Sequence, residues 1–576
     1  MATKALAALL ATMVCASLAS YAGPAEPRRL NNVVTQLAEV ESLSGDAESV
    51  DFSNPRDGWI FIGVGKAAGA EPRAVIDAAG SALVWRTNPR SGAPEAMVKL
   101  PKGAHQLRVE GAQGLRLDVR AIPEIQYCYY PTKPHIAAYG PYDWAYMEKY
   151  VLPDVNTIVT RSEVDPDQFA EWLREGRQWL SNASLPGLSN ETAPSPDAVY
   201  AYWAENSVVT KPGFGGLIVD EFIGASEGHY AAWAEAWGRL HETPGFAGKE
   251  FYAWCGNMWD EPASLEFAKK LMKKGDLFVW EQYLREGKDE QDAREEIDRC
   301  KSHFAKWKQE LPGVEKQMVV CLGYLSAPPE SLNLNPSADY QVYLDMQFYA
   351  LATAPEFDGV YGVMEYMADY ADEESLRYAQ KLFRHYCIEG NTARFNKDPY
   401  LLPHLKNADF ADGLDHWRAE PADEGSIDSR SMKGFSWLEG RYPETKQGDT
   451  FCWMKRAGEK PNRVLQPLQQ LTPGRLYSVK AIAADPAQLD VQKETRIDIE
   501  VAGADIVQKF GFSFAYPSCY SHEVEPYSER HPAWFTLHRA VFRATGPTAE
   551  LAISDRGEAG AETAFNFVEV QPFVEH

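Results

Sequence analysis

The sequence lacks most of the motifs that assign a chain to a common chemical class. Its eight cysteines form no C-x-x-C pair, no H-E-x-x-H occurs, and the stretch 63–69 lacks the spacing of a dinucleotide-binding loop. The formal net charge is −25, which argues against nucleic acid as the main partner, because phosphate binding needs clustered Lys and Arg. We therefore expect no cofactor and no metal site, and no motif supports a structural Ca²⁺ ion.

Long hydrophobic runs are also scarce. One apolar stretch, residues 5–18, follows Lys4, and the small-residue segment Ser20-Tyr21-Ala22 comes after it. The stretch is too short for a membrane span and no second one follows, so residues 1–22 are predicted to be a secretory signal peptide. We expect a secreted or periplasmic protein without a membrane span.

The remaining chain falls into three regions. A length of 576 residues predicts about three or four domains rather than one core. Over residues 45–123, short runs that alternate in period two are separated by Gly, Pro and Asn turns, which predicts a small β-sandwich domain.

The region 124–395 has a different pattern, in which short apolar runs alternate with helical stretches. Helical spacing of apolar residues predicts helices over 167–176, 229–240, 264–274, 289–309 and 373–386. Eight β-α units over this length predict a (β/α)₈ TIM barrel. The predicted strands are 125–130, 156–160, 178–184, 216–222, 250–255, 277–283, 318–324 and 359–366.

Short alternating strands return over residues 405–576. The region opens with Asn407-Ala-Asp-Phe-Ala-Asp-Gly-Leu-Asp-His-Trp417 and carries Leu471-Thr-Pro-Gly-Arg-Leu-Tyr477 in its middle. Both motifs resemble those of the jelly-roll carbohydrate-binding modules that are attached to many secreted glycoside hydrolases. The resemblance implies a jelly-roll fold, and it leaves open whether the domain binds sugar or is purely structural.

Carboxylates end three of the predicted barrel strands. Asp220 and Glu221 end the fourth, Glu281 ends the sixth and Glu365 ends the eighth. Barrel enzymes place their chemistry at this end of the strands, and hydrolysis of a glycosidic bond needs two carboxyl groups in one cleft. Because adjacent strand residues point to opposite sides, we expect one of Asp220 and Glu221 to face the cleft, and we favour Glu221.

These acids make the central region similar to the barrel-type glycoside hydrolases, many of which carry the acid/base Glu on strand 4. The resemblance implies that Glu221 is the general acid/base. The seventh strand ends at Gly323-Tyr324 without an acid, which favours Glu281, with Glu365 in reserve, as nucleophile or second base. Asp-Glu at the strand-4 end is also similar to families in which the substrate's acetamido group is the nucleophile and the Asp orients it.

Aromatic and amide side chains near the strand ends are candidates for binding a polysaccharide or oligosaccharide substrate. Aromatic faces stack on the apolar faces of sugars, and amides bind hydroxyl groups. Packing inside the fold is the alternative role for each of them. The candidates are Tyr130, Trp144, Asn182, Trp254, Asn257, Trp280 and Tyr366.

Two other functions remain open. A non-catalytic glycan-binding protein could keep the barrel as a platform, and its strand-end acids would then be salt-bridged or scattered. A serine esterase is suggested by Gly224-Ala-Ser226-Glu-Gly228, which matches G-x-S-x-G between a strand and a helix. However, the strand ends several residues before Ser226, and no HGGG-like oxyanion loop precedes it.

Overall fold

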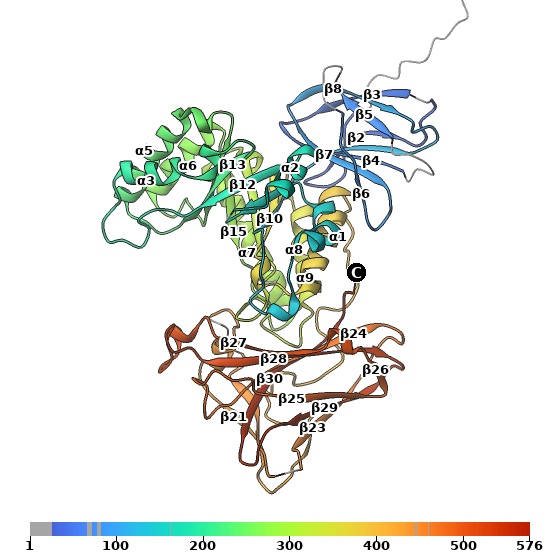
Figure 1. Cartoon of the computed structure of the whole chain (residues 1–576), viewed down its shortest axis with the longest axis vertical. Helices are drawn as coiled ribbons and strands as arrows, with labels where there is room; N and C mark the ends of the chain where they lie inside the picture. The colour runs from blue at the N-terminus through green and yellow to red at the C-terminus, as the bar shows by residue number, and fades with distance from the viewer. Residues whose placement is uncertain are drawn as a thin grey trace, which may run out of the picture. The chain divides into compact units, whose positions relative to one another are not determined.

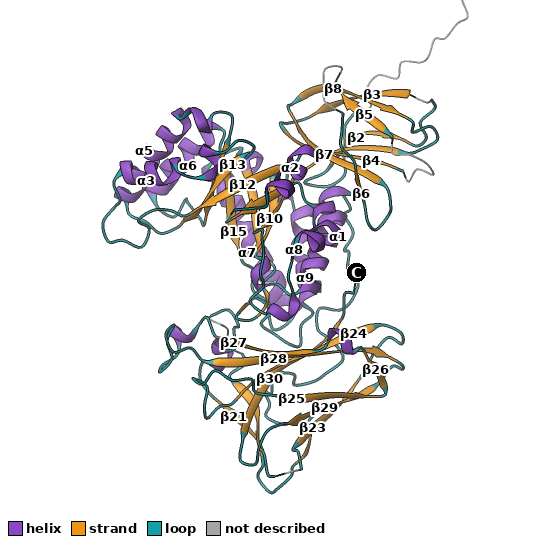
Figure 2. Ribbon diagram, in the orientation of Figure 1, coloured by secondary structure: helices purple, strands orange, loops and turns teal. Residues whose placement is uncertain are grey.

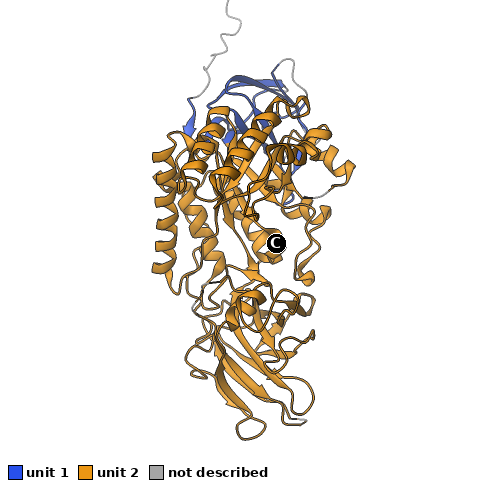
Figure 3. Cartoon of the chain, turned by 90° about the vertical axis from the view of Figure 1, so that its left-hand side faces the viewer, with its two compact units in different colours: residues 1–29, 35–121 blue, residues 30–34, 122–576 orange. Residues whose placement is uncertain are grey.

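The structure is a computed structural model that describes residues 26–45, 47–65, 72–77, 82–161, 163–443, 445, 447–458 and 460–575. The predicted signal peptide lies outside the described residues. The chain divides into two compact units (Figure 3). The first holds residues 35–121 with the described residues before 30, and the second holds residues 30–34 and the chain from 122 onward. Among the described residues, no helix is long and apolar enough to cross a membrane.

The first unit is a β-sandwich of two antiparallel sheets, as the alternating pattern predicts. Alternate residues of both sheets, among them Ile60, Leu107 and Val119, fill one shared core. Its strands begin before residue 45. The larger sheet has the order β1 (Arg28–Arg29), β2 (Thr35–Val40), β9 (Leu117–Ile122), β4 (Gly58–Val64), β7 (Pro94–Leu100) and β6 (Arg86–Thr87), and the smaller has β3 (Ala47–Asn54), β8 (Gly103–Glu110) and β5 (Arg73–Ile76).

Eight parallel strands of the second unit close into a barrel, which confirms the predicted (β/α)₈ architecture. The strands are apolar on both faces because one face lines the barrel and the other meets the helices. All eight strands lie where the sequence predicts them. They are β10 (Glu124–Cys128), β11 (Thr157–Thr160), β12 (Gln178–Ala183), β13 (Gly216–Phe222), β14 (Glu250–Cys255), β15 (Leu277–Gln282), β16 (Met318–Gly323) and β19 (Gly362–Tyr366).

Helices surround these strands (Figure 2). Five of them match the predicted ones within a few residues: α2 (Pro166–Arg174), α5 (Glu227–Glu242), α6 (Pro262–Lys274), α7 (Glu290–Glu310) and α9 (Glu373–Leu382), which continues as a π-helical turn, Phe383–Ile388. The sequence did not predict α1 (Trp144–Tyr150), α3 (Pro196–Ala204), α4 (Ser207–Thr210) or α8 (Tyr340–Thr353). A short hairpin of β17 (Ser326–Ala327) and β18 (Glu330–Ser331) follows β16.

The C-terminal β domain is a two-sheet sandwich, in agreement with the predicted jelly roll (Figure 1). One apolar core lies between its sheets, and one helical turn, α10 (Phe435–Leu438), precedes β22. The smaller sheet has the order β20 (Arg418–Glu420), β23 (Arg463–Leu468), β29 (Ala549–Asp555) and β25 (Ile497–Ala502). The larger has β21 (Ile427–Ser431), β22 (Thr450–Lys455), β30 (Glu562–Pro572), β24 (Leu476–Ala484), β28 (Trp534–Ala544) and β26 (Ala504–Ile506), with β27 (Phe512–Pro517) also paired to β28.

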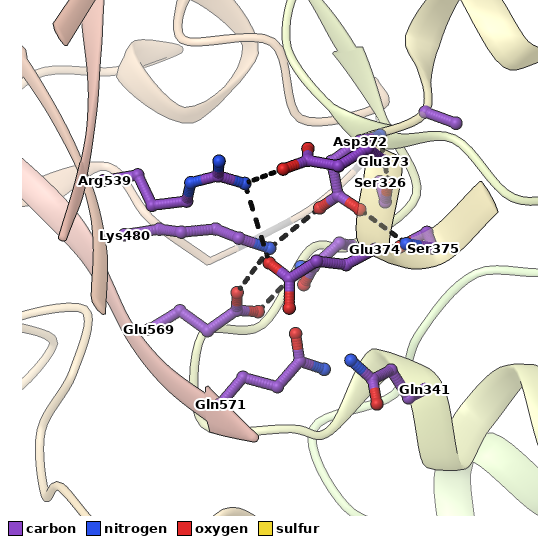
Figure 4. A network of polar contacts seen from close by, with 12 residues as sticks. Ser326, Gln341, Asp372, Glu373, Glu374, Ser375, Lys480, Arg539, Glu569 and Gln571 are labelled. Atoms are coloured by element: carbon purple, nitrogen blue, oxygen red, sulfur yellow. Dashed lines mark hydrogen bonds and ion pairs between the residues drawn. The ribbon is translucent and has the colours of Figure 1, made fainter. Parts of the chain in front are cut away.

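A buried polar network joins the barrel to the C-terminal β domain (Figure 4). Lys480 of β24, whose side chain is only 5% exposed, pairs with Asp372 at 2.9 Å and with Glu569 of β30 at 3.1 Å. Asp372 is the N-cap of α9, and Arg539 of β28 pairs with Glu373 of the same helix at 2.7 Å. The two parts of this unit are therefore held together by ion pairs out of contact with water.

Candidate active site

Alternation along the strands brings side chains from the strand ends into the mouth of the barrel. The barrel core contains Val159, Leu180, Ile218, Val279 and Met364. Each residue two positions further along its strand faces the same way, because side chains alternate with period two. The groups that meet at this mouth, called the mouth residues below, are Tyr129, Arg161, Asn182, Asp220, Trp254, Glu281 and Tyr366.

A β-bulge changes the expected arrangement of the two acids on β13. Val219 pairs with Ala253 and Phe222 pairs with Cys255, so two residues of β13 stand opposite the single residue Trp254 of β14. Phe222 then points outward, with its ring 5.8 Å from that of Trp233 on α5. Asp220 and Glu221 therefore occupy together the place of one strand residue, and both lie at the mouth. The expectation that they point to opposite faces is wrong.

Glu221 occupies the strained position of this bulge. Its φ is 71°, a left-handed conformation that a residue with a Cβ atom rarely adopts. The Ile223 N–H donates to the Glu221 carbonyl at 2.7 Å, which closes a tight turn behind the acid. The Glu221 side chain is exposed at the rim. Strain of this kind, on the order of 1–3 kcal/mol, collects at functional sites.

Asp220 and Glu281 both lie at the mouth, and the pKa of each carboxyl group is raised. Burial, followed by the charge of Glu221, raises the pKa of Asp220 to about 6, although Arg161 opposes the shift. Burial, followed by the charge of Asp220, raises the pKa of Glu281 to about 7. Neither acid forms an ion pair within the described residues, and the Tyr129 hydroxyl donates to Asp220 Oδ2 at 3.5 Å.

Aromatic rings line the walls around these acids. The Trp254 ring lies 6.0 Å from Tyr129 and 5.3 Å edge-on from Tyr366, measured between centroids. Tyr283, which follows β15, stacks on Tyr366 at 5.0 Å. These rings pack on one another beside the pair of acids, with Tyr129 and Trp254 buried and Tyr366 partly exposed, and a substrate-binding role for Trp254 and Tyr366 stays a prediction.

Arg161 is a mouth residue that reasoning from the sequence missed. Its guanidinium carbon lies 4.0 Å from the centre of the Tyr129 ring, and its Nη1 lies 3.8 Å from Asp369 Oδ2. The signal was present, because Arg161 stands two residues after the inward-facing Val159. Asn182 was predicted and does lie at the mouth, where its amide donates to the Ile218 carbonyl at 3.4 Å.

Glu365 lies on the other side of its strand. Met364 and Tyr366 face the barrel interior, so Glu365 points outward toward the helices, where it is 1% exposed. Neither of its carboxylate oxygens has a hydrogen-bond partner within the described residues, and burial raises its pKa well above the ordinary value. A carboxyl group in these surroundings stays protonated and is remote from the Asp220–Glu281 pair.

Four of the proposed sugar-binding residues serve packing instead. Trp280 faces α7, and its indole donates to Asn257 Oδ1 at 3.0 Å, so these two residues hold each other outside the mouth. Tyr130 and Trp144 pack on Trp179 with centroid distances of 6.1 and 6.4 Å. Trp179 itself points outward from β12, because its neighbour Leu180 points inward.

The G-x-S-x-G segment does not form a nucleophile elbow. Ser226 is the N-cap of α5, and its Oγ lies 2.7 Å from Nδ1 of His229, one turn into the helix. The other ring nitrogen of His229 is buried without a hydrogen-bond partner within the described residues. A catalytic Ser–His pair needs an acid at that nitrogen. The contact between Ser226 and His229 therefore belongs to the structure of the helix N-terminus.

The two motifs shared with carbohydrate-binding modules build turns in the C-terminal β domain. The Asn407 amide donates to the carbonyls of Gly413 and Asp415, both at 2.9 Å, and the Trp417 indole donates to the Asn407 carbonyl at 3.1 Å. The Tyr477 hydroxyl accepts from the Thr472 N–H at 2.9 Å. Both motifs therefore stabilise turns of this domain.

Metal-ligating residues do not gather elsewhere. Over the described part of the chain, no group of three or more His, Cys, Asp or Glu residues is arranged to hold a metal ion.

Comparisons with known proteins give remote structural likenesses. No protein-family model and no curated protein matches the sequence. The chain is similar to β-glucuronidase 2 of Bacteroides uniformis (8% identity, 94% of this chain and 80% of that one, TM-score 0.36) and to a putative α-galactosidase of Bacteroides fragilis (9% identity, 88% and 100%, TM-score 0.33). Part of it is similar to TmCBM61, solved in complex with β-1,4-galactotriose (14% identity, 30% and 99%, TM-score 0.19). Likenesses this weak assign no function, so a functional proposal depends on the site itself.

Proposed function

We propose that this protein is a glycoside hydrolase that cleaves a poly- or oligosaccharide with the carboxyl groups of Asp220 and Glu281. The observation that supports this most is that the two acids share an aromatic barrel mouth, where burial raises the pKa of both and the charge of Asp220 further raises that of Glu281. Export of the enzyme, expected from residues 1–22, is part of the proposal.

The two acids have different roles in this mechanism. Glu281, whose pKa is raised to about 7, keeps its proton near neutral pH and donates it to the oxygen of the leaving sugar. Asp220, whose pKa is raised only to about 6 and which lies near Arg161, is ionised there. Its carboxylate either attacks the anomeric carbon or activates a water molecule that does so. Glu221, exposed at the rim, binds a substrate hydroxyl instead of acting as the general acid expected from the sequence.

The strand geometry is compatible with this pairing. One strand, β14, separates β13 from β15, so their backbones are roughly 10 Å apart. Side chains that converge into the mouth bring the carboxyl groups closer than their backbones, toward the separations of about 5–9.5 Å that hydrolysis requires.

Release of reducing ends from a panel of neutral and acetamido polysaccharides tests the proposal. Asp220→Asn and Glu281→Gln should each lower kcat/KM by roughly 100- to 10,000-fold, because each removes a proton donor or acceptor of the reaction. Glu365→Gln is the matched control, since it changes a buried strand-end acid that faces away from the mouth, and it should retain activity. The pairing would be refuted if Glu365→Gln abolished activity while Asp220→Asn and Glu281→Gln remained active.

The alternative functions predict other results. A glycan-binding protein would bind polysaccharides with the same affinity in the wild type and in both mouth variants, and would release no reducing ends. A serine esterase would hydrolyse aryl esters and lose that activity in Ser226→Ala, which a glycoside hydrolase would not.

A further inference from the structure

A cleft of about 660 Å³ opens beside the mouth at the C-terminal ends of β11 and β12. Its lining comes from the segment between β11 and α2, from the end of β12, and from α4 with the loop after it. Arg161 and Asn182 belong both to this lining and to the mouth residues. The volume lies within the range of about 300–1,000 Å³ that is usual for sites that bind small molecules.

The cleft combines an apolar part with a polar one. Phe169 and Phe214 have ring centroids 4.8 Å apart, and Pro212 extends this apolar part. Asn182 and Ser207 contribute polar groups to the same lining. Sugar rings have an apolar face and a hydroxyl-bearing edge, so a mixed lining of this kind suits them better than a fully apolar or fully charged ligand.

The charges of the cleft are balanced. Lys211 pairs with Glu163 at 3.1 Å, and Arg161 lies 3.8 Å from Asp369. Glu205 adds a further acid to the lining. Without an excess of positive charge, the cleft does not select for an anionic ligand, and a neutral sugar is the better fit.

Side-chain contacts link the cleft to the acid pair. The Tyr129 hydroxyl lies 3.5 Å from Asp220, and the Arg161 guanidinium lies over the Tyr129 ring at 4.0 Å. Arg161 then forms part of the cleft. A chain of sugar residues that passes the carboxyl groups can therefore extend past Arg161 and Asn182 into the cleft.

We propose that this cleft binds neutral sugar residues of the substrate chain adjacent to the cleaved bond, so that the enzyme acts on oligo- or polysaccharides in preference to small glycosides. The position of the cleaved bond rests on the function proposed above, whereas binding of a sugar chain in the cleft does not.

Filling the cleft tests this inference. Ser207 lines it from α4 and is half-buried, so Ser207→Trp occupies its space without deleting a core side chain. Thr210 lies on the same short helix, is exposed and does not line the cleft, which makes Thr210→Trp the matched control. Asn182→Ala removes a lining amide without adding volume and serves if Ser207→Trp does not fold.

Binding is measured by calorimetry in the Glu281→Gln background, which prevents turnover. The probes are β-1,4-linked di- and hexasaccharides of glucose, N-acetylglucosamine, galactose and xylose. We expect one hexasaccharide to bind at least tenfold more weakly after Ser207→Trp, with its disaccharide and the Thr210→Trp protein unchanged. In the active enzyme, the same substitution should lower kcat/KM for the hexasaccharide and leave that for an aryl glycoside within about twofold.

The possible outcomes separate this inference from the proposed hydrolase. The cleft proposal is overturned if no hexasaccharide binds, or if Ser207→Trp and Asn182→Ala bind it as tightly as Thr210→Trp does. Binding that depends on Ser207, in a wild type that cleaves none of the probes, would support the cleft and contradict the hydrolase.

Discussion

Replacement of Glu281 by Gln should stabilise the protein at alkaline pH. The pKa of this carboxyl group rises from an ordinary value of 4.5 to about 7 on folding, chiefly through burial and the charge of Asp220. The unfolded chain therefore gives up the proton at lower pH than the folded one. Because the folded pKa is the higher one, the contribution to stability is fully present below about pH 4.5 and is lost as the pH rises through about 7.

The size of the effect follows from the same pKa values. A rise from 4.5 to about 7 corresponds to about 3 kcal/mol of destabilisation once the group is ionised. Gln does not ionise, so the variant escapes this cost, less about 1 kcal/mol where its amide finds no partner. We expect Glu281→Gln to be more stable than the wild type by about 2 kcal/mol at pH 8, and equal to it or slightly less stable at pH 4.5.

Thermal unfolding at the two pH values measures this difference without any knowledge of the substrate. Glu266→Gln on α6 is the control, since that side chain is 66% exposed and pairs with Lys269 at the surface. Its difference from the wild type should not change between the two pH values. A Glu281→Gln protein that is less stable than the wild type by the same amount at pH 4.5 and at pH 8 would refute the assignment of Glu281 as a buried, destabilising carboxyl group.

Activity should show a bell-shaped pH dependence with its maximum between about 6 and 7, because Asp220, with a pKa near 6, must be ionised and Glu281, with a pKa near 7, must be protonated; a rate that is constant between pH 4 and 9 would contradict the pairing. Lys480→Met should cost about 3–5 kcal/mol in thermal or urea unfolding, because it leaves buried acids without their cation. Lys455→Met removes a 52% exposed side chain that pairs with Glu562 and should cost less than about 1 kcal/mol. Asn407→Ala should destabilise the C-terminal β domain by about 1–3 kcal/mol through its lost turn bonds, and glycan affinity lost at unchanged stability would show that this motif binds ligand instead.

The barrel strands could be predicted because both faces of each strand are buried, which gives a short continuous run of apolar residues in the sequence. The run Gly216–Val219 is buried throughout, and so is Met318–Gly323. Helix α8 could not be predicted in the same way. It is buried nearly all round, and even Asp345 and Gln347 lie inside, so no apolar stripe marks it as a helix.

The arrangement of the acids at the mouth was harder to predict from the sequence, because it depends on one extra residue in β13. The period-two rule puts Asp220 and Glu221 on opposite faces, but the bulge between Val219 and Phe222 returns both to the mouth. No residue in this segment predicts a bulge. The left-handed position, where a glycine would have been a signal, is occupied by Glu221. On β19, which has no bulge, the rule puts Tyr366 inward and Glu365 outward, so Glu365 became a candidate only because the rule was not applied there.

The ion pairs of Lys480 have a consequence for folding during translation. Asp372 and Glu373 emerge from the ribosome about a hundred residues before Lys480, and Glu569 follows nearly two hundred residues after them. At roughly 5–20 residues per second, translation leaves this end of the barrel without Lys480 for about 5–20 s, and without the whole network for about twice as long. The buried network at this end of the barrel can therefore form only after the C-terminal β domain has been made, and until then its acids are not covered by that domain.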